Sequence, residues 1–193
     1  MMLMNRFFGL LLYGLAIAFV AGFVHLVSVL AMPRLAPHDA FARLSALAQG
    51  KQPFLLPRPM PGKELTPFED PAVVQSACLF DLSQGPLKVE ANVDDDALLT
   101  LSFRSRTGAV FYSMTDKASV HGKIDIRVMT AAQLQAAQAQ DDEDNPPQEL
   151  RIVAPQMRGF ILIDALAPFP SQRANAEARA LSVNCAPETV AQD

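Results

Sequence analysis

The sequence predicts a mainly β fold, an antiparallel sandwich or barrel-like sheet with a C-terminal helix, preceded by one transmembrane helix. Two observations lead to this fold class: a long uncharged N-terminal segment, and a series of short segments rich in Val, Ile, Leu, Phe and Tyr after Pro71. Turn-forming residues separate these segments at close intervals, as in antiparallel sheets. We therefore expect an anchor at 1–33, a juxtamembrane helix and Pro-rich connector at 34–70, an extracytoplasmic β-rich domain at 71–186 and a disordered tail at 187–193.

The N-terminal segment contains no Asp, Glu, Lys or Arg from Phe7 to Met32. As a helix it would be about 39 Å long at ~1.5 Å per residue, which exceeds the ~30 Å hydrocarbon core of a bilayer. A secretory signal has an apolar region of only about 7–15 residues, so the length favours a retained anchor that ends at Pro33. Cleavage is the alternative, because Val29-Leu30-Ala31 resembles a small-residue cleavage site.

The orientation of this anchor depends on two opposed observations. Arg6 precedes the apolar segment and Arg34 and Arg43 follow it, so the positive-inside rule mildly favours a cytoplasmic C-terminus. The short N-terminal tail and the large following domain favour the opposite, because large domains are translocated largely regardless of charge. We expect a single-pass protein of the bacterial inner membrane with its C-terminal domain in the periplasm.

One side of the anchor carries small residues. Gly14, Ala18 and Gly22 recur every four residues, the pattern of closely packed membrane helices, and His25 projects into the same arc. Because an imidazole is costly against lipid, one interpretation is a transmembrane packing face for another envelope protein or for a second copy of the chain. The alternative is that Gly and Ala are simply common in such helices, that His25 lies near the outer headgroups, and that the lipid bilayer is the partner.

The connecting part begins with a short amphipathic helix predicted over 37–48. Asp39 can cap its start and Gly50 can end it. We expect this helix to lie at the membrane surface or against the domain. Residues 51–67 contain five prolines and predict an extended connector.

The β-rich domain is predicted to contain seven strands and two helices. In 123–130, Ile124, Ile126 and Val128 alternate with charged residues, the pattern of a half-buried strand. An Ala/Gln-rich helix is expected over 131–140. The remaining strands are expected at 72–82, 87–93, 97–106, 109–115, 149–154 and 159–165, and the C-terminal helix at 171–184.

Cys78 and Cys185 are the two cysteines of the chain. They are too few for a zinc site and form no C-x-x-C pair. In an exported domain two cysteines indicate a disulfide, which here would fasten the C-terminal helix to the first strand. Closing a loop of about 100 residues stabilises by roughly 4–5 kcal/mol on the chain-entropy model. Two buried free thiols are the alternative.

No pattern in the sequence specifies catalysis, and we assign no catalytic residue, metal ligand or cofactor. A Gly-x-Ser-x-Gly elbow and a Ser-x-x-Lys at a helix start are both missing. Asp94-Asp95-Asp96 lacks the spaced ligands and glycine of a calcium loop and predicts a charged hairpin turn. Asp81, Asp116 and His121 are residues from which a site could be assembled, provided that the fold brings them together.

The net charge of −4 limits the classes of partner. Without Arg6 the chain has 15 basic and 20 acidic residues, a balance of −5. A domain of this sign has no electrostatic footprint for nucleic acid, so we exclude nucleic acid as a partner.

Motifs along most of the chain occur in a characteristic order: His25, Pro33-Arg34-Leu35-Ala36, Asp39-Ala40, Arg43-Leu44, Pro67-Phe68, Asp70-Pro71-Ala72, Cys78, Asp81-Leu82, Gly85-Pro86, Phe111-Tyr112 and Cys185. In this order they resemble short alphaproteobacterial membrane proteins of the domain-of-unknown-function family twelve fifty-four. The resemblance implies a β-rich extracytoplasmic domain and a companion protein of family twelve fourteen. It implies no catalytic residue.

The function expected from the sequence is that of a membrane-anchored envelope protein whose domain binds or scaffolds another envelope component. Such a domain needs an anchor and a complementary surface rather than reactive side chains. The alternative is an envelope enzyme or a small-ligand-binding domain with an unidentified site. A cavity with convergent polar groups inside the sheet would favour the alternative, and a filled apolar core with a flat exposed patch would favour the binding module.

Overall fold

The computed structural model describes residues 2–35, 39–50, 52–60, 62, 69–93, 98–142 and 147–188. The chain divides into two compact units, residues 1–37 and residues 38–193.

The first unit is the helix α1 (Met2–Leu35). Its 27-residue segment Arg6–Met32 is long and apolar enough to span a membrane, and its large apolar side chains are exposed, as contact with lipid requires. The helix ends two residues later than the predicted stop at Pro33, since a proline removes its own N–H but not those of the residues that follow.

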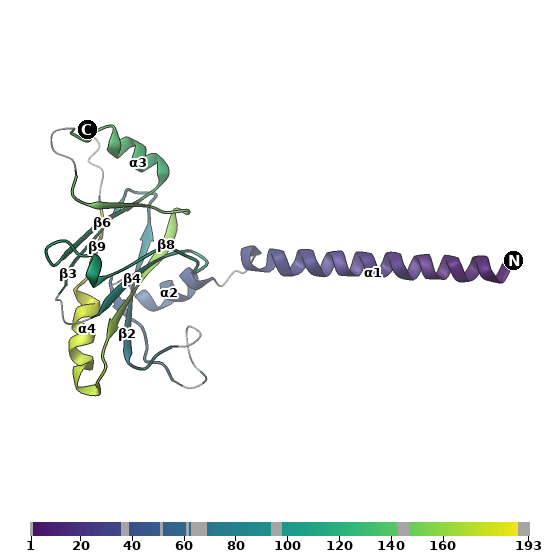
Figure 1. Cartoon of the computed structure of the whole chain (residues 1–193), viewed down its shortest axis with the longest axis horizontal. Coiled ribbons are helices and arrows are strands. Elements are labelled where there is room, and N and C mark those ends of the chain that lie inside the picture. Colours follow the sequence, from purple (N-terminus) through teal and green to yellow (C-terminus); the bar gives the residue numbers. More distant parts are fainter. Residues whose placement is uncertain are drawn as a thin grey trace. The chain divides into compact units, whose positions relative to one another are not determined.

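The second unit is a sandwich of two β-sheets (Figure 1), which confirms the predicted mainly β class. The five-stranded sheet has the order β1-β2-β8-β4-β5 and the four-stranded sheet the order β7-β6-β3-β9. The described strands are β1 (Phe54–Leu55), β2 (Val73–Asp81), β3 (Leu87–Asn92), β4 (Leu99–Ser105), β5 (Val110–Thr115), β6 (Lys123–Met129), β7 (Leu150–Val153), β8 (Arg158–Leu166) and β9 (Asn184–Pro187).

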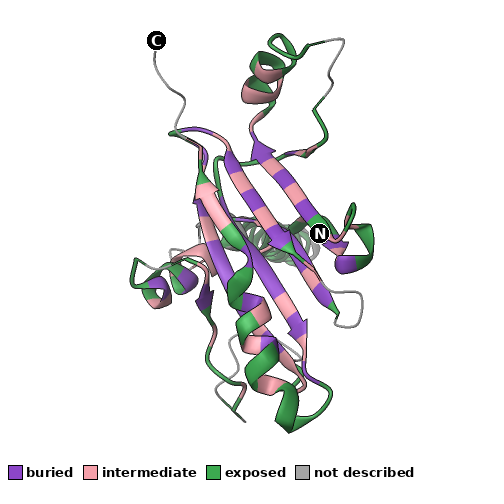
Figure 2. Cartoon of the chain, turned by 90° about the vertical axis from the view of Figure 1, so that its left-hand side faces the viewer, coloured by how far each residue is buried: buried purple, intermediate pink, exposed green. Residues whose placement is uncertain are grey.

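One apolar core fills the space between the sheets. Successive side chains of a strand point to opposite faces, so alternate residues of both sheets enter this core, as the alternating colours of the strands in Figure 2 show. In β6 the predicted pattern is confirmed, because Ile124, Ile126 and Val128 are buried while Asp125 and Arg127 are half-buried on the outer face. The other sheet contributes fully buried side chains that include Val74, Leu101, Phe103, Ile161 and Ile163.

The C-terminal helix α4 (Arg173–Ser182) packs on β2 and β8 and extends the same core. Its buried Ala176 and Ala180 are small, which allows the helix backbone to approach the sheet closely. The hydroxyl of buried Ser76 donates to the carbonyl oxygen of Ala180 (2.6 Å). The last carbonyls of a helix lack partners within the helix, so this bond satisfies one of them and fastens the end of α4 to β2.

The helix α2 (Ala40–Ala48) packs on the outer face of the five-stranded sheet, where the side chain of Phe54 from the edge strand β1 joins the same apolar cluster. Asp39 caps α2, as predicted, by accepting a hydrogen bond from the backbone N–H of Ala42 (2.8 Å), and it also pairs with Arg106. Of the two positions expected for this helix, the structure shows the one against the domain, and both elements belong to the same compact unit as the sandwich. The buried residues of this second apolar cluster are Leu44, Ala48, Phe54, Ala77 and Phe160.

Three features of the strand arrangement were not predicted. Phe54–Leu55, expected within the connector, pairs with β2 as an edge strand. The end of the chain was expected to be frayed, but β9 pairs with β3 as far as Pro187. The pair of β6 and β7 is parallel, whereas the other strand pairs of the described residues are antiparallel, and the helix α3 (Ala131–Gln138) lies between β6 and β7 in the sequence.

Candidate functional site

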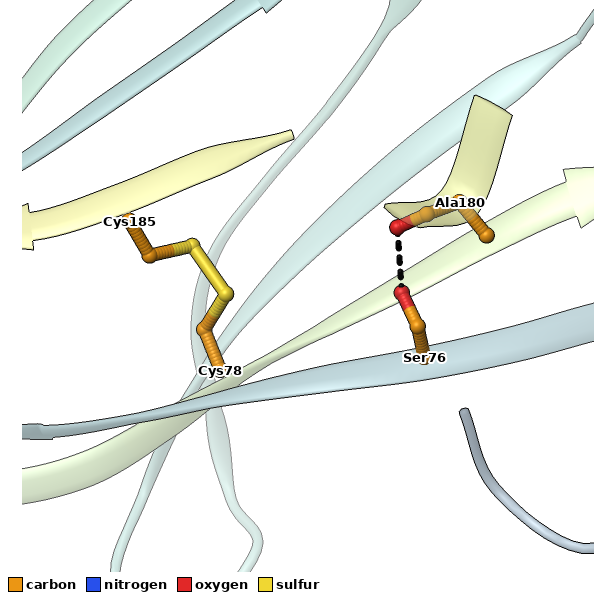
Figure 3. Close-up of a disulfide and its surroundings, with 4 residues drawn as sticks. All are labelled: Ser76, Cys78, Ala180 and Cys185. Atoms are coloured by element: carbon orange, nitrogen blue, oxygen red, sulfur yellow. Dashed lines mark hydrogen bonds between the residues drawn. A yellow bond between two sulfur atoms is a disulfide. The ribbon is translucent and has the colours of Figure 1, made fainter. Parts of the chain in front are cut away.

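The expected disulfide between Cys78 and Cys185 is present. Figure 3 shows that it runs from β2 of one sheet to β9 of the other, beside the contact between Ser76 and Ala180. Cys185 lies beyond the end of α4, so the bond fastens the two sheets to each other rather than the C-terminal helix to the first strand. Its role in the structure is therefore to close the sandwich.

The four residues of the predicted transmembrane packing face, Gly14, Ala18, Gly22 and His25, are exposed on α1. A Cβ atom added at Gly14 or Gly22 would meet no atom within 4 Å among the described residues of the chain. The space that a second helix would need is thus open along this face, and its use for packing stays a prediction.

Asp81 and Asp116 lie far apart. Asp81, at the end of β2, pairs with Arg158 of β8 (2.6 Å). Asp116 is buried near the start of β4, where its carboxylate faces the backbone N–H of Leu99 at 3.4 Å. Leu99 pairs with Ala165, which is seven residues from Arg158 along β8, a separation of about 23 Å at ~3.3 Å per residue. These two carboxylates therefore cannot act on one substrate atom.

His121 is explained by the backbone of a turn. It and Gly122 both have positive φ angles (52° and 72°) and connect Val120 to Lys123, which exchange backbone hydrogen bonds of 3.0 and 3.1 Å. This is the geometry of a two-residue hairpin turn. His121 also borders a shallow hollow of about 660 Å³ over β6 and β7, but neither Asp81 nor Asp116 lines that hollow.

The acidic turn signals have ordinary structural roles where they are described. Asp70 accepts a hydrogen bond from the backbone N–H of Ala72 (2.8 Å), which forms an Asx-type turn into β2. The predicted turn at Asp94-Asp95-Asp96 lies outside the described residues. Among the residues that the structure describes, no group of three or more His, Cys, Asp or Glu is arranged to hold a metal ion.

A groove that the sequence analysis missed lies on the outer face of the five-stranded sheet, with a volume of about 490 Å³. Three polar residues stand side by side across it, because Gln75 of β2 and Thr100 of β4 both pair with Asp164 of β8. Its apolar lining comes from Val73, Leu98, Leu162 and Leu166, and its remaining lining residues are Glu69, Asp70 and Arg104.

Asp164 is half-buried in the middle of this groove. One of its carboxylate oxygens accepts a hydrogen bond from the side-chain amide of Gln75 (2.9 Å). Burial raises the pKa of the Asp164 carboxyl above its ordinary value, whereas the hydrogen bond from Gln75 and the positive charge of Arg104 act in the opposite direction. Folding therefore disfavours the charged carboxylate form of Asp164.

Arg104 lies in the same groove, four residues from Thr100 along β4. Its Nε atom is buried without a hydrogen-bond partner, and its Nη1 atom makes only a long hydrogen bond of 3.4 Å to the carbonyl oxygen of Gly108. Within the described part of the chain, no ion pair joins Arg104 to Asp164. Asp164 and Arg104 thus lie in one groove with opposite charges and are not paired with each other.

A sequence signal for this groove existed. Asp164 is the acidic residue in the otherwise apolar segment from Phe160 to Leu166, which was predicted as a strand without attention to its carboxylate. The partners of Asp164 could not be named from the sequence, because Gln75 is 89 residues away and its position depends on the sheet order.

No protein-family model matches the chain, and no curated protein matches it. Two solved structures are similar. The VPA0106 protein from Vibrio parahaemolyticus has a TM-score of 0.47 and 10% sequence identity over 66% of this chain and 33% of that chain. An uncharacterized protein from Burkholderia cenocepacia has a TM-score of 0.45 and 10% identity over 70% of this chain and 35% of that chain. The chain thus spans about a third of the length of each of these structures.

Proposed function

We propose that this protein is a single-pass inner-membrane protein whose periplasmic β-domain binds or scaffolds another envelope component. The observation that carries the proposal is the presence, in one chain, of a membrane-length apolar helix and a disulfide-bonded domain. Disulfides persist in oxidising compartments such as the periplasm and are rare in the cytosol. The disulfide between Cys78 and Cys185 therefore supports the orientation in which the β-domain lies in the periplasm.

Binding is favoured over catalysis by the state of the sandwich interior. One contiguous apolar core of buried side chains from both sheets lies between them. The residues considered for an assembled site, Asp81, Asp116 and His121, are engaged in three separate turns or strand ends. A domain of this kind acts through its outer surfaces.

The resemblance to family twelve fifty-four supports a protein partner, the companion of family twelve fourteen, and the small-residue face of α1 supports contact within the membrane. Close backbone approach at Gly14, Ala18 and Gly22, with a hydrogen bond from His25, would supply the attraction that hydrophobicity does not provide between helices in lipid.

The orientation is tested with reporters fused after Asp193. A reporter that is active in the periplasm should function, and one that requires the cytoplasm should not. The reverse pattern would place the domain in the cytoplasm and remove the basis of the proposal.

The binding role is tested by co-purification of the detergent-solubilised full-length chain. Gly14→Ile combined with Gly22→Ile should weaken recovery of a membrane partner, or of a differently tagged second copy, because the larger side chains prevent close packing. Ala16→Ile, on another side of the helix, is the matched control and should change recovery much less. Equal recovery with both variants would show that α1 serves as a plain tether.

A further inference from the structure

We propose that the free edge of β5 pairs with β5 of a second copy of the chain, antiparallel about a two-fold axis, so that the two five-stranded sheets join into one continuous sheet. A strand at the edge of a sheet leaves every second backbone N–H and C=O group without a strand partner. The inference goes beyond the proposed function, because the contact lies in the β-domain and requires neither the packing face of α1 nor another envelope protein.

Among the described strands, three of the four at a sheet edge are protected against pairing with another chain. The strand β1 is two residues long and lies between Pro53 and Pro57, which have no backbone N–H. The strand β7 carries the charged side chain of Arg151, and β9 ends at Pro187. Short length, charge and proline are the features by which natural sheets prevent association at an edge.

The fourth edge strand, β5, has none of these three features. It is the longest of the four, with six residues, and the sequence from Ala109 to Thr115 contains neither a charged residue nor a proline. Val110 is 52% exposed and Tyr112 is 36% exposed, and among the described residues β4 is the one strand that pairs with β5. An uncharged edge of this length is a template for a further strand.

The regular part of β5 determines how two copies can meet. Its pairing with β4 is regular over Tyr112–Thr115, beyond a bulge in the earlier part of the strand. Tyr112 and Met114 lie on the face that covers the core, whereas Ser113 lies on the outer face and is exposed. Residues directly opposite each other in a sheet share a face, so the two-fold axis must place a residue opposite its own copy. Ser113 opposite Ser113 of the second copy places Tyr112 opposite Met114.

A second copy is the expected occupant for two reasons. Because β5 carries no charge, pairing it with itself places no like charges opposite each other, as self-pairing of a charged strand would. A two-fold contact also uses both free edges and is closed, so association stops at the dimer. One short strand pair buries less than the ~1,600 Å² of a standard interface, so we expect a transient dimer with a micromolar or weaker dissociation constant.

The test is hydrogen exchange of the full-length chain in detergent, followed by mass spectrometry at protein concentrations from about 1 μM to about 1 mM. The outward N–H groups of β5 bond to water in the monomer and to the second copy in the dimer, so exchange of the peptide that contains β5 should slow as the concentration rises. Exchange of β7, an edge strand in both states, should not change. Association through α1 alone would leave the exchange of β5 independent of concentration, and that result would overturn the proposal.

Two charge variants identify the partner as a second copy. Ser113→Lys places two positive charges opposite each other and should raise the dissociation constant of the dimer about tenfold or more. Ser113→Glu should do the same, and an equimolar mixture of the two variants should restore the protection of β5, because opposite charges then meet. Ser171→Lys, the same substitution at an exposed serine outside β5, is the matched control and should leave the dimer unchanged.

Wild-type protection of β5 in Ser113→Lys would contradict the proposed pairing. Equal protection of β5 in the mixture and in either variant alone would also contradict it, since opposite charges would then bring no gain. If a variant does not fold, the concentration dependence of exchange in the unchanged chain still decides the question.

Discussion

The outer faces of the two sheets carry their charges in opposite ways. On the four-stranded sheet, Arg127 pairs with Glu149 (2.8 Å) and donates to Glu188 (3.1 Å), and Arg151 pairs with Asp141 (2.6 Å). On the five-stranded sheet, one part of the outer face is covered by α2, and the groove contains charged side chains among which no ion pair joins Arg104 to Asp164.

The two faces therefore differ in how far their charges pair with one another. The four-stranded sheet has several ion pairs, although the Oδ1 atom of Asp125 and the Nε atom of Arg127 are buried there without a hydrogen bond. The groove contains a half-buried carboxylate whose pKa is raised by desolvation and a guanidinium with a buried, unbonded nitrogen. Perturbed groups of this kind in a surface recess mark candidate functional sites, because a ligand can supply the interactions that the fold leaves unmet.

The largest change in the free energy of unfolding is expected when the disulfide between the two sheets is removed. Cys78→Ser combined with Cys185→Ser opens a loop with a sequence separation of 107 residues and should lower the free energy of unfolding by roughly 4–5 kcal/mol. Denaturant titration of the full-length chain measures this loss. Alkylation of denatured, unreduced wild-type protein should label neither cysteine, and quantitative labelling would show that the bond does not form in cells.

A somewhat smaller effect tests whether the covered part of the five-stranded sheet is structural. Phe54 is buried against Ala77 and Phe160, so Phe54→Ala should cost about 3–5 kcal/mol of unfolding free energy through lost burial and the cavity left behind. Phe169→Ala is the control, because the Phe169 side chain is 62% exposed. Equal stability of the two variants would mean that Phe54 is not packed in this apolar cluster as described.

A third variant tests the compensated face. Arg127→Gln removes the ion pairs to Glu149 and Glu188, but Glu149 keeps Arg151 as a partner. The loss of unfolding free energy should be about 1 kcal/mol and should shrink as salt is added, since partly exposed ion pairs are screened. A salt-independent loss several times larger would show that this network is a structural core rather than a solvated surface.

The smallest change in the free energy of unfolding is expected for Asp164→Asn, and it should be an increase rather than a decrease. A carboxyl whose pKa is higher in the folded chain than in the unfolded chain binds protons more tightly when folded. Its contribution to stability is therefore greatest below the unfolded pKa and is lost as the pH rises through the folded pKa. Asn carries no charge and can keep the bond from Gln75, so the variant should be slightly more stable than wild type at neutral pH.

Unfolding free energies of both proteins measured from acidic to neutral pH check this sign. The difference in favour of Asp164→Asn should grow as the pH rises. A variant that is less stable at neutral pH would show that the Asp164 carboxylate stabilises the empty domain, and the contrast between the two faces would fail.

Much of the local structure could be predicted from the sequence, because strand alternation and helix capping depend on residues that are close together in the chain. The alternation in 123–130 predicted β6, and Asp39 predicted the start of α2. The uncharged run from Phe7 to Met32 predicted the apolar helix for the same reason, since an apolar segment of that length suits a bilayer core.

The short strands and the groove were decided by tertiary structure. A strand as short as β1 has no sequence pattern of its own and exists because β2 offers a free edge, and β9 is held beside β3 after α4 has returned the chain to the sandwich. The order β2-β8-β4 places Gln75, Asp164 and Thr100 in one row, although they come from distant parts of the chain. Strand order depends on the packing of the whole core and on contacts between residues far apart in sequence. The sequence by itself therefore determined the longer elements and the two cysteines able to pair, and only the assembled sheets determined the short strands β1 and β9 and which charges share a groove.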